Sequence, residues 1–270
     1  MMMPNLFFVI HPGVEPACGH NKIGHKIVVP PNTGKTHRRK LICRNGKVLG
    51  SNNTALAKLL YFWGEYESGS EAVVIGKGPI SPKGLHFTLL PATGSFNVAR
   101  CSCNTDPYVY GDEFYYSCCK RKSRPGTYQN GDIILFGSWK KGGSPPFSFS
   151  FELDTLMVVK EERDLKMFSR NSNFYRASIL PLARKAPKSI VVGEMYHSKD
   201  NPKGPFSFVP CRTSICSSKP EINLSRYGII NSGNPQMNPA PVSVSAKEWS
   251  TIVSEVQNQG FELGVFMLDI

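Results

Sequence analysis

Residues 130–137 read Asn-Gly-Asp-Ile-Ile-Leu-Phe-Gly, an unbroken apolar run between two turn sequences. A run of this length, rich in β-favouring side chains and bounded by Asn, Asp and Gly, predicts a buried strand at residues 132–136. The same pattern recurs outward in both directions along the chain. The further predicted strands cover residues 6–10, 25–29, 41–44, 72–75, 85–90, 96–100, 114–117, 147–159, 189–192 and 206–209.

Helical spacing of apolar residues appears first at residues 54–63. Four large apolar side chains recur there at intervals of three and four, and Asn53 or Thr54 can cap the first turn. These side chains are Leu56, Leu59, Leu60 and Trp63. The spacing predicts a helix over residues 54–63.

A second helix is predicted near the C-terminus, and the sequence marks both its start and its end. Ser245 and Glu248 form a capping box, in which the serine caps a backbone amide and the glutamate reaches back. Gly260 is placed to end the helix in the left-handed conformation. The apolar stripe between them is Trp249, Ile252, Val253 and Val256. Residues 162–169 predict a third, shorter helix.

The ratio of strands to helices decides the fold class. A doubly wound parallel sheet needs a helix between most of its strands, and this chain has too few. The sequence therefore predicts an α+β fold with a mixed, largely antiparallel sheet, barrel-like in one alternative, and a few flanking helices. A length of 270 residues allows a single domain over residues 1–270, which is the organisation we expect.

The chain carries a formal net charge of +12, from 32 Lys and Arg against 20 Asp and Glu. Such a surplus favours a polyanionic partner, although a surplus that only keeps the protein soluble is the alternative. No apolar run approaches the ~20 residues that span a bilayer. The apolar N-terminus lacks the basic region and cleavage site of a signal peptide. The sequence therefore predicts a cytoplasmic protein with no membrane partner.

Eight cysteines are too few for a disulfide scaffold in a chain of this length. Cys101/Cys103 and Cys118/Cys119 lack the spacing of zinc-binding knuckles, so reduced thiols are the preferred interpretation and a metal at these cysteines the alternative. The sequence contains no Walker-type loop, no Gly-x-Ser-x-Gly elbow and no deaminase signature. No cofactor is therefore expected.

Positive charge concentrates in runs that contain no acidic residue. The first run covers residues 35–47, the second residues 120–124, and a third lies in a predicted hairpin turn at residues 140–141. Unpaired Lys and Arg side chains on loops bind phosphates and release counterions, so these runs predict nucleic-acid contacts. The predicted contact residues are Lys35, Arg38, Arg39, Lys40, Arg44, Lys120, Arg121, Lys122, Arg124, Lys140 and Lys141.

The segment before the second basic run combines aromatic and acidic residues. Its tyrosines can stack on exposed bases, the alternative being that they fill the core. Asp106-Pro and Tyr110-Gly-Asp112 are turn sequences, so their carboxylates are expected on loops within reach of a ligand. Carboxylates beside a cationic cluster suit general acid–base chemistry or the stabilisation of a cationic sugar, while turn formation alone is the simpler explanation.

Several short motifs together resemble the nucleotide modification-associated domain proteins, over most of the chain. The strand after Gly131-Asp132 is also similar to one in the wider PUA-like group of ASCH, EVE and YTH relatives. The motifs are the first apolar strand with the loop His11-Pro-Gly13 to Cys18-Gly-His20-Asn21, the turns at Asp106 and Asp112, the strands at 130–136 and 151–159, and the helix end from Trp249 to Phe261.

The resemblance implies a protein that acts on or reads modified bases in DNA, in conflict between phage and host. A base inside a duplex must be flipped into a pocket for that purpose. For a glycosylase, Asp112 or Asp106 would activate water or stabilise the cationic sugar, with Tyr110 stacking on the base. The residues expected to complete the base pocket are Asn104, Glu113, Tyr108, His20 and Asn21.

Several functions remain as hypotheses. The first is a DNA glycosylase that excises a modified base, for example a hydroxymethylated or glucosylated cytosine, in defence against phage. The second is a non-catalytic reader that binds such a base in the same pocket, and the third is an RNA-binding PUA-like module. A metal-dependent hydrolase built on Cys18, His20 and His25 is a fourth, without a carboxylate at useful spacing.

Overall fold

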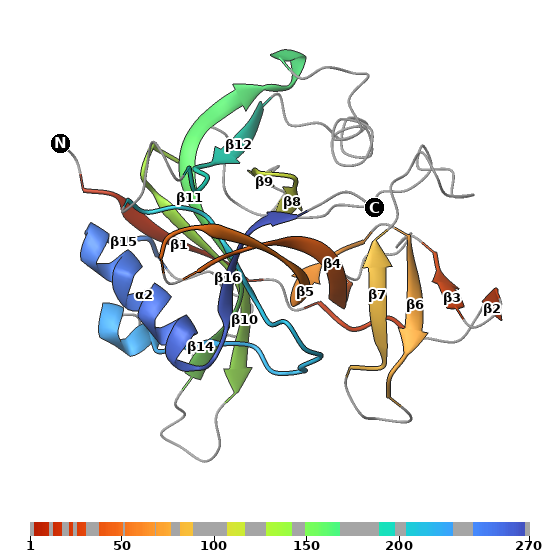
Figure 1. Cartoon of the computed structure of the whole chain (residues 1–270). Helices are drawn as coiled ribbons and strands as arrows, with labels where there is room; N and C mark the ends of the chain where they lie inside the picture. The colour runs from red at the N-terminus through yellow and green to blue at the C-terminus, as the bar shows by residue number, and fades with distance from the viewer. Residues whose placement is uncertain are drawn as a thin grey trace.

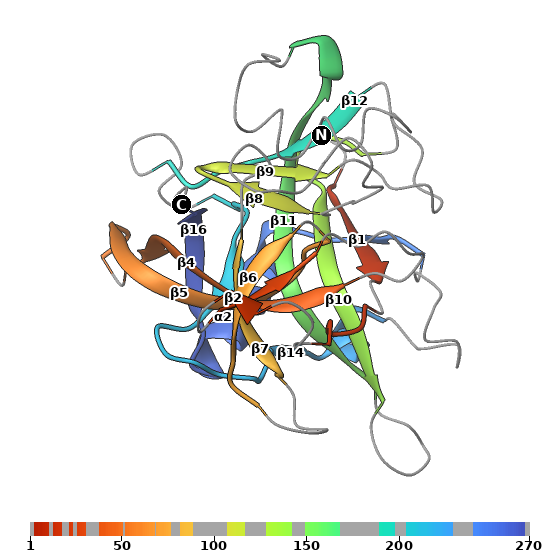
Figure 2. The same ribbon diagram turned by 90° about the vertical axis from the view of Figure 1, so that its right-hand side faces the viewer.

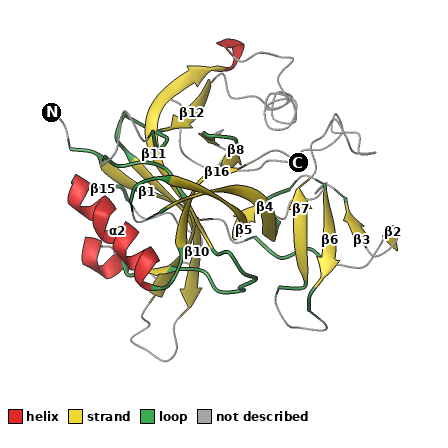
Figure 3. Cartoon of the chain, viewed as in Figure 1, coloured by secondary structure: helices red, strands yellow, loops and turns green. Residues whose placement is uncertain are grey.

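Two mixed β-sheets and one α-helix make up the described part of the chain, so the fold is α+β as the sequence predicts. Over these residues neither sheet closes on itself, so the barrel-like alternative is wrong. Figure 3 shows the α-helix on one side of the molecule, with one short 3-10 helix beside it and another at the far end of a long strand. The computed structural model describes residues 3–10, 13–17, 22–23, 26–30, 38–50, 52–67, 69–76, 82–88, 107–116, 128–141, 149–167, 189–197, 204–228 and 240–267.

The first sheet has the strand order β15-β1-β10-β11-β12-β9-β8, and β14 pairs with β11 beside this path. Strand β1 pairs parallel with β10, and the other pairs in this sheet are antiparallel. The strands are β1 (Asn5–Ile10), β8 (Tyr108–Tyr110), β9 (Glu113–Tyr116), β10 (Ile133–Lys141), β11 (Phe149–Asp164), β12 (Ser189–Gly193), β14 (Glu221–Ile222) and β15 (Val242–Ser243).

The second sheet has the order β13-β16-β4-β7-β6-β3-β2, and β5 pairs with β4 beside this path. Figure 1 shows its end strands β2, β3, β6 and β7 far from the helix. The strands are β2 (Lys22–Ile23), β3 (Lys26–Val29), β4 (Arg39–Leu49), β5 (Ala55–Glu65), β6 (Ser70–Val74), β7 (Gly84–Thr88), β13 (Val209–Cys211) and β16 (Glu262–Met267).

Residues 54–63, predicted as a helix, form most of strand β5, so that prediction is wrong. Every residue of β5 pairs with a residue of β4. Alternation along a strand places Leu56 and Leu60 on one face and Leu59 on the other, so the apolar side chains form no single stripe. Leu60 is fully buried, while Leu56 and Leu59, nearer the start of the strand, are 48% and 43% exposed. A local spacing that suits a helix is overridden here by long-range strand pairing.

Helix α2 (Ala246–Asn258) confirms the predicted C-terminal helix and its capping box. The backbone N–H of Ser245 donates to Glu248 Oε2 at 2.7 Å, and Gly260 has the left-handed φ of 78° expected after the helix. The shorter helix predicted at residues 162–169 is wrong over its described part. Strand β11 continues there to Asp164, and a 3-10 turn, Leu165–Met167, follows it.

One core cluster joins the helix to both sheets. It contains Ile252 of α2, Leu6 and Leu135 of the first sheet, and Leu263 of the second, each at most 1% exposed. Figure 2, turned by 90°, shows β10 and β11 running the length of the molecule. The apolar runs that predicted buried strands therefore supply the contact surface between the helix and the two sheets.

Asp132 ties the start of β10 to the start of β1. Its carboxylate is 1% exposed and accepts hydrogen bonds from the backbone N–H groups of Asn5 (2.8 Å) and Gln129 (2.7 Å). A buried carboxylate with two backbone donors is satisfied. The acid in the Gly131-Asp132 turn thus has a structural task, which is to hold the parallel strand pair in register.

Gly137 sits at a register shift in the β10–β11 pair, where a side chain has no room. A Cβ built there would lie 2.1 Å from the carbonyl oxygen of Glu152 and 2.8 Å from the ring of Phe151. Gly137→Ala is therefore expected to cost about 1–3 kcal/mol of unfolding free energy, measured by urea denaturation. Gly64→Ala is the control, because a Cβ there makes only ordinary van der Waals contacts, with Ile42 Cδ1 at 3.5 Å and Phe62 Cε2 at 4.0 Å. Equal losses in the two variants would contradict the crowding argument.

Candidate functional site

The predicted catalytic segment around Asp112 forms a β-hairpin. Strands β8 and β9 pair antiparallel, and Gly111 and Asp112 make the two-residue turn between them. Gly111 has a φ of 60°, as the first position of such a turn favours. It also exchanges two backbone hydrogen bonds with Met267 of β16, at 2.7 and 2.8 Å. Asp112 is exposed at this turn, so the hairpin by itself accounts for its position.

The described tyrosine side chains of this hairpin fill the core instead of forming an open stacking face. Tyr108, predicted in the base pocket, is 5% exposed, and Tyr115 and Tyr116 are 3% and 2% exposed. Burial is the largest cause that raises the pKa of Tyr115, and a hydrogen bond with Glu113 is the second largest. The alternative that these rings pack inside is therefore correct for Tyr108, Tyr115 and Tyr116. Glu113 itself is half-buried beside Tyr115, and the side chain of Tyr110 lies outside the described part of the structure.

Three of the predicted phosphate contacts are buried, so they cannot bind a polyanion at the surface. Arg39, Lys40 and Arg44 are 4%, 1% and 6% exposed on β4. Lys40 Nζ donates to Ser70 Oγ at 2.9 Å, and Arg44 Nη1 donates to the carbonyl of Val109 at 3.5 Å. The prediction fails because β4 lies between other strands, and its cations find partners from distant parts of the chain.

Two further predicted contacts lie nearer the surface. Arg38 is half-buried and precedes β4. Lys140 is exposed but forms an ion pair with Glu221, and it is therefore not a free cation. The predicted site residues that lie outside the described residues are Asp106, Asn104, His20, Asn21, Lys35, Lys120, Arg121, Lys122, Arg124 and the side chain of Lys141.

A buried charge cluster, absent from the sequence-based predictions, lies where β4 and β11 meet. Arg39 forms an ion pair with Asp154, whose other carboxylate oxygen lies 3.4 Å from Lys219 Nζ. Lys219 also lies 3.8 Å from Glu152 and 5.2 Å from the centre of the Trp63 ring. Burial lowers the pKa of Arg39 to about 10, so this guanidinium stays charged at neutral pH.

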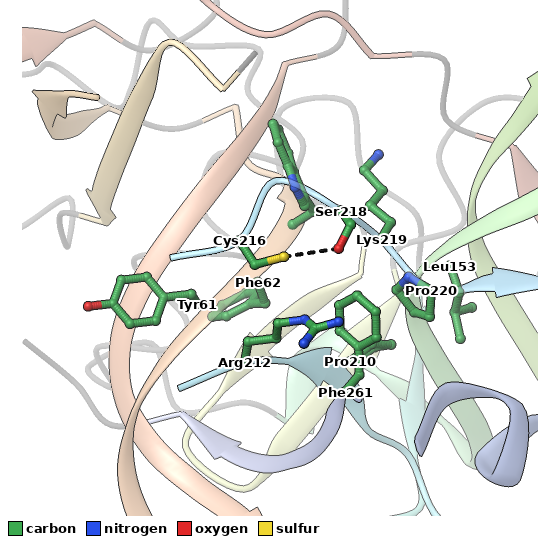
Figure 4. A pocket seen from close by; sticks show the side chains of 11 residues that line it. Tyr61, Phe62, Leu153, Pro210, Arg212, Cys216, Ser218, Lys219, Pro220 and Phe261 are labelled. Atoms are coloured by element: carbon green, nitrogen blue, oxygen red, sulfur yellow. Dashed lines mark hydrogen bonds between the residues drawn. The ribbon is translucent and has the colours of Figure 1, made fainter. Parts of the chain in front are cut away.

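Lys219 also lines a small pocket beside this cluster. Figure 4 shows side chains from β5, from β13 and its following loop, and from the turn before β16 around the same space. The cavity is about 10 Å³, which is room for roughly one water-sized molecule. The lining residues are Tyr61, Phe62, Trp63, Leu153, Pro210, Arg212, Cys216, Ser218, Lys219, Pro220 and Phe261.

Lys219 should make stability depend on pH. Burial and the neighbouring Arg39 lower its pKa from 10.5 to about 7, although Glu152 acts in the opposite direction. Between about pH 7 and 10.5 the unfolded chain therefore binds more protons, and stability rises with pH. We measure the urea concentration at the midpoint of unfolding at pH 7 and at pH 9. From pH 7 to pH 9 this midpoint should rise more in the wild type than in Lys219→Met. Lys247→Met, which removes an exposed cation, should run parallel to the wild type, and a parallel Lys219→Met profile would contradict the assignment.

Among the described residues, no group of three or more His, Cys, Asp or Glu side chains is arranged to hold a metal ion. Cys101, Cys103, Cys118 and Cys119 lie outside those residues, so the metal alternative for them stays a prediction. No helix in the described ranges is long and apolar enough to cross a membrane.

Comparison with known proteins adds no relative. No family model, characterised protein or solved structure matches this chain. The resemblance to nucleotide modification-associated domain proteins therefore stays a prediction, and the function has to be argued from the residues.

Charge is distributed unevenly between the described residues and the rest of the chain. Acidic and basic side chains nearly balance in number among the described residues, so most of the net charge of +12 belongs to residues outside them. Sequence reasoning missed one such segment: residues 168–188 hold five Lys and Arg and no acid. Its signal was the absence of acids over a long stretch, because the basic residues are too scattered to form a visible run.

Proposed function

We propose that the protein binds nucleic acid, and that it reads a modified base in DNA. The observation that carries the proposal is topological: two acid-free basic segments are attached to the same end of the first sheet. Residues 117–127 follow β9 directly, and residues 168–188 join the 3-10 turn after β11 to the start of β12. We call this end of the sheet, where β9 and β11 finish and β12 begins, the connection end.

Strand register supports this grouping. At the connection end Asp164 of β11 pairs with Ser189 of β12. Val191 of β12 pairs in turn with Tyr116, the last residue of β9. Adjacent strands in a sheet lie about 5 Å apart, so these three strand termini lie within a short distance of one another. Positive segments anchored together supply a field that attracts a polyanion better than the same charges dispersed.

Reading a base is favoured over cutting it by the surroundings of Asp112. A carboxylate that activates water or stabilises a cationic sugar works best in a site that excludes bulk water, and Asp112 is exposed at a hairpin turn. Excision by Asp106 or Asp112 remains the second candidate, because the sequence resemblance favours it. The two candidates share the binding step and differ in whether the glycosidic bond breaks.

Binding is tested by fluorescence anisotropy with duplexes that contain cytosine, hydroxymethylcytosine or glucosylated cytosine, and with RNA, over a range of salt concentrations. The variant Arg121→Gln, Lys122→Gln should bind more weakly, and its slope of log K against log salt should fall by about 2. The matched control is Arg226→Gln, Lys247→Gln, which removes one Arg and one Lys from exposed positions at α2 and its neighbouring 3-10 turn. Equal weakening in both variants, or no binding at low salt, would overturn the proposal.

The same duplexes separate the candidates. Alkaline cleavage after incubation reveals abasic sites, which a reader does not create. Abasic sites that vanish in Asp106→Asn or Asp112→Asn would establish the glycosylase, and tight binding without abasic sites would establish the reader. If unmodified RNA competes better than every DNA duplex, the RNA-binding alternative replaces both.

A further inference from the structure

A short junction attaches one end of the second sheet to the rest of the molecule. Over the described residues, β7 pairs with β4 at two positions, Leu41 with Leu85 and Ile42 with His86, whereas β5 pairs with β4 along eleven residues. Strands β3, β6 and β7, which we call the end lobe, lie together at one side of the molecule in Figure 1. So small a junction is where local opening of the sheet is expected to cost the least free energy.

The end lobe has a small apolar core of its own. Ile27, Val29 and Ala72 form a buried cluster that is separate from the large clusters of the molecule. Leu85 instead joins the cluster around Trp63, on one face of the junction. The lobe can therefore separate from β4 by breaking two strand pairs, one small apolar contact and the polar contacts on the other face of the junction.

Three buried polar side chains are hydrogen-bonded in a row on that other face. Lys40 of β4 is 1% exposed, and Ser70 of β6 and His86 of β7 are 0% exposed. Lys40 Nζ donates to Ser70 Oγ at 2.9 Å, and Ser70 Oγ lies 3.0 Å from His86 Nδ1. Because each residue comes from a different strand, this row of hydrogen bonds ties the end lobe to β4.

The row of hydrogen bonds requires a neutral His86. In the neutral ring Nδ1 can accept the hydroxyl proton of Ser70, whose oxygen accepts from Lys40. Protonation would turn Nδ1 into a donor and leave the buried hydroxyl proton without an acceptor. It would also place a second positive charge near Lys40, out of contact with water. Burial, and after it the positive charge of Lys40, lowers the pKa of His86 from 6.5 to about 3.

No carboxylate is hydrogen-bonded to His86 within the described ranges, and its buried Nε2 has no partner there. The acids of β5 and β6 lie on the opposite face of the sheet, because alternation along each strand separates them from His86. The titratable and charged side chains around the junction are Arg39, Glu65 and Glu71 on that opposite face, Arg44 on the face of His86, and Tyr66 and Glu67 in the connection from β5 to β6.

We propose that Lys40, Ser70 and His86 form an acid-sensitive latch, which holds the end lobe on β4 at neutral pH and releases it in acid. In the open lobe His86 meets water and takes up a proton near its ordinary pKa of about 6.5. The closed lobe does not take up this proton until the pH is far lower, so acid favours the open form below about pH 6.5. Between pH 7 and pH 5 the ratio of open to closed lobe should rise about 25-fold.

The test is hydrogen exchange of the whole protein at pH 7 and pH 5, read by mass spectrometry and corrected for the intrinsic pH dependence of exchange. We expect the protection of the β6 and β7 amides to fall about 25-fold, and that of β10 and β11 to fall much less. His86→Asn keeps an acceptor for Ser70 but cannot take up a proton, so it should abolish the fall. His197→Asn, which replaces a half-buried histidine outside the end lobe, should leave the fall unchanged.

A second measurement covers the case in which His86→Asn fails to fold. Nuclear magnetic resonance of the imidazole nitrogens in the wild type at pH 5 should show a neutral His86, with its proton on Nε2, wherever the end lobe stays protected. A protonated His86 in a lobe whose protection is unchanged would overturn the proposal. Equal losses of protection in the end lobe and in β10 and β11 would overturn it as well, because the whole fold would then open in acid.

Discussion

An Asp154→Ala variant is expected to lose about 3–5 kcal/mol of its free energy of unfolding, because it leaves a buried guanidinium without its carboxylate. The side chains of Arg39 and Asp154 are 5% and 4% exposed, so water cannot replace the missing partner. Lys219 loses the same carboxylate, which lies 3.4 Å from its Nζ. Urea denaturation at pH 7, followed by intrinsic fluorescence, measures the loss.

Glu221→Ala is the matched control for this prediction. It removes the partner of Lys140 in an ion pair whose side chains are 39% and 53% exposed, and we expect a loss below about 1 kcal/mol. Similar losses in Asp154→Ala and Glu221→Ala would contradict the prediction. That result would mean that other acids near Arg39 compensate for Asp154.

Trp249→Ala should have the second largest effect, a loss of about 3–5 kcal/mol, because it removes the main anchor of α2 on the core. Trp249 is 8% exposed, its ring meets the ring of Phe206 edge-on at 4.9 Å, and its Nε1 donates to the carbonyl of Phe206 at 3.2 Å. Far-UV circular dichroism during urea unfolding gives the measurement.

Trp249→Phe separates packing from hydrogen bonding at this position. It keeps most of the apolar contact but leaves the Phe206 carbonyl unpaired, at a cost of about 1–3 kcal/mol. Val253→Ala truncates a half-buried neighbour on the same helix and should cost less than either change. If Trp249→Ala is as stable as Val253→Ala, the prediction is wrong and other contacts hold the helix on the core.

The sequence predicts well those elements whose signals are local. The helix at α2 has its cap, its apolar stripe and its terminating glycine within sixteen residues, from Ser245 to Gly260, and each agrees with the others. Strand β5 also carries apolar residues at helical spacing, over a stretch about as long as that of α2. It is a strand because eleven residues of β4 pair with it, and the spacing carries no trace of that pairing.

The basic strand β4 shows the same limit for the site. Its cations look like surface residues because residues 35–47 contain no acid. Their partners come from elsewhere: Asp154 lies 115 positions from Arg39, and Ser70 lies 30 positions from Lys40. The pocket at Cys216 joins four distant segments in the same way. A local sequence pattern covers one short segment of the chain, so it cannot reveal a site that is assembled from several distant segments.

Strand β1 completes the first sheet between β15 and β10, and β16 completes the second between β13 and β4. The pairing of β16 with β4 joins residues more than two hundred positions apart. Contacts of that separation form slowly, because the closure of a long loop precedes the stabilising pairs. During synthesis, β4 and β13 therefore keep unpaired edges until residues 262–267 have left the ribosome. The second sheet is thus completed only after residues 262–267 are made, and the interval before that is when the edges of β4 and β13 most need protection from aggregation.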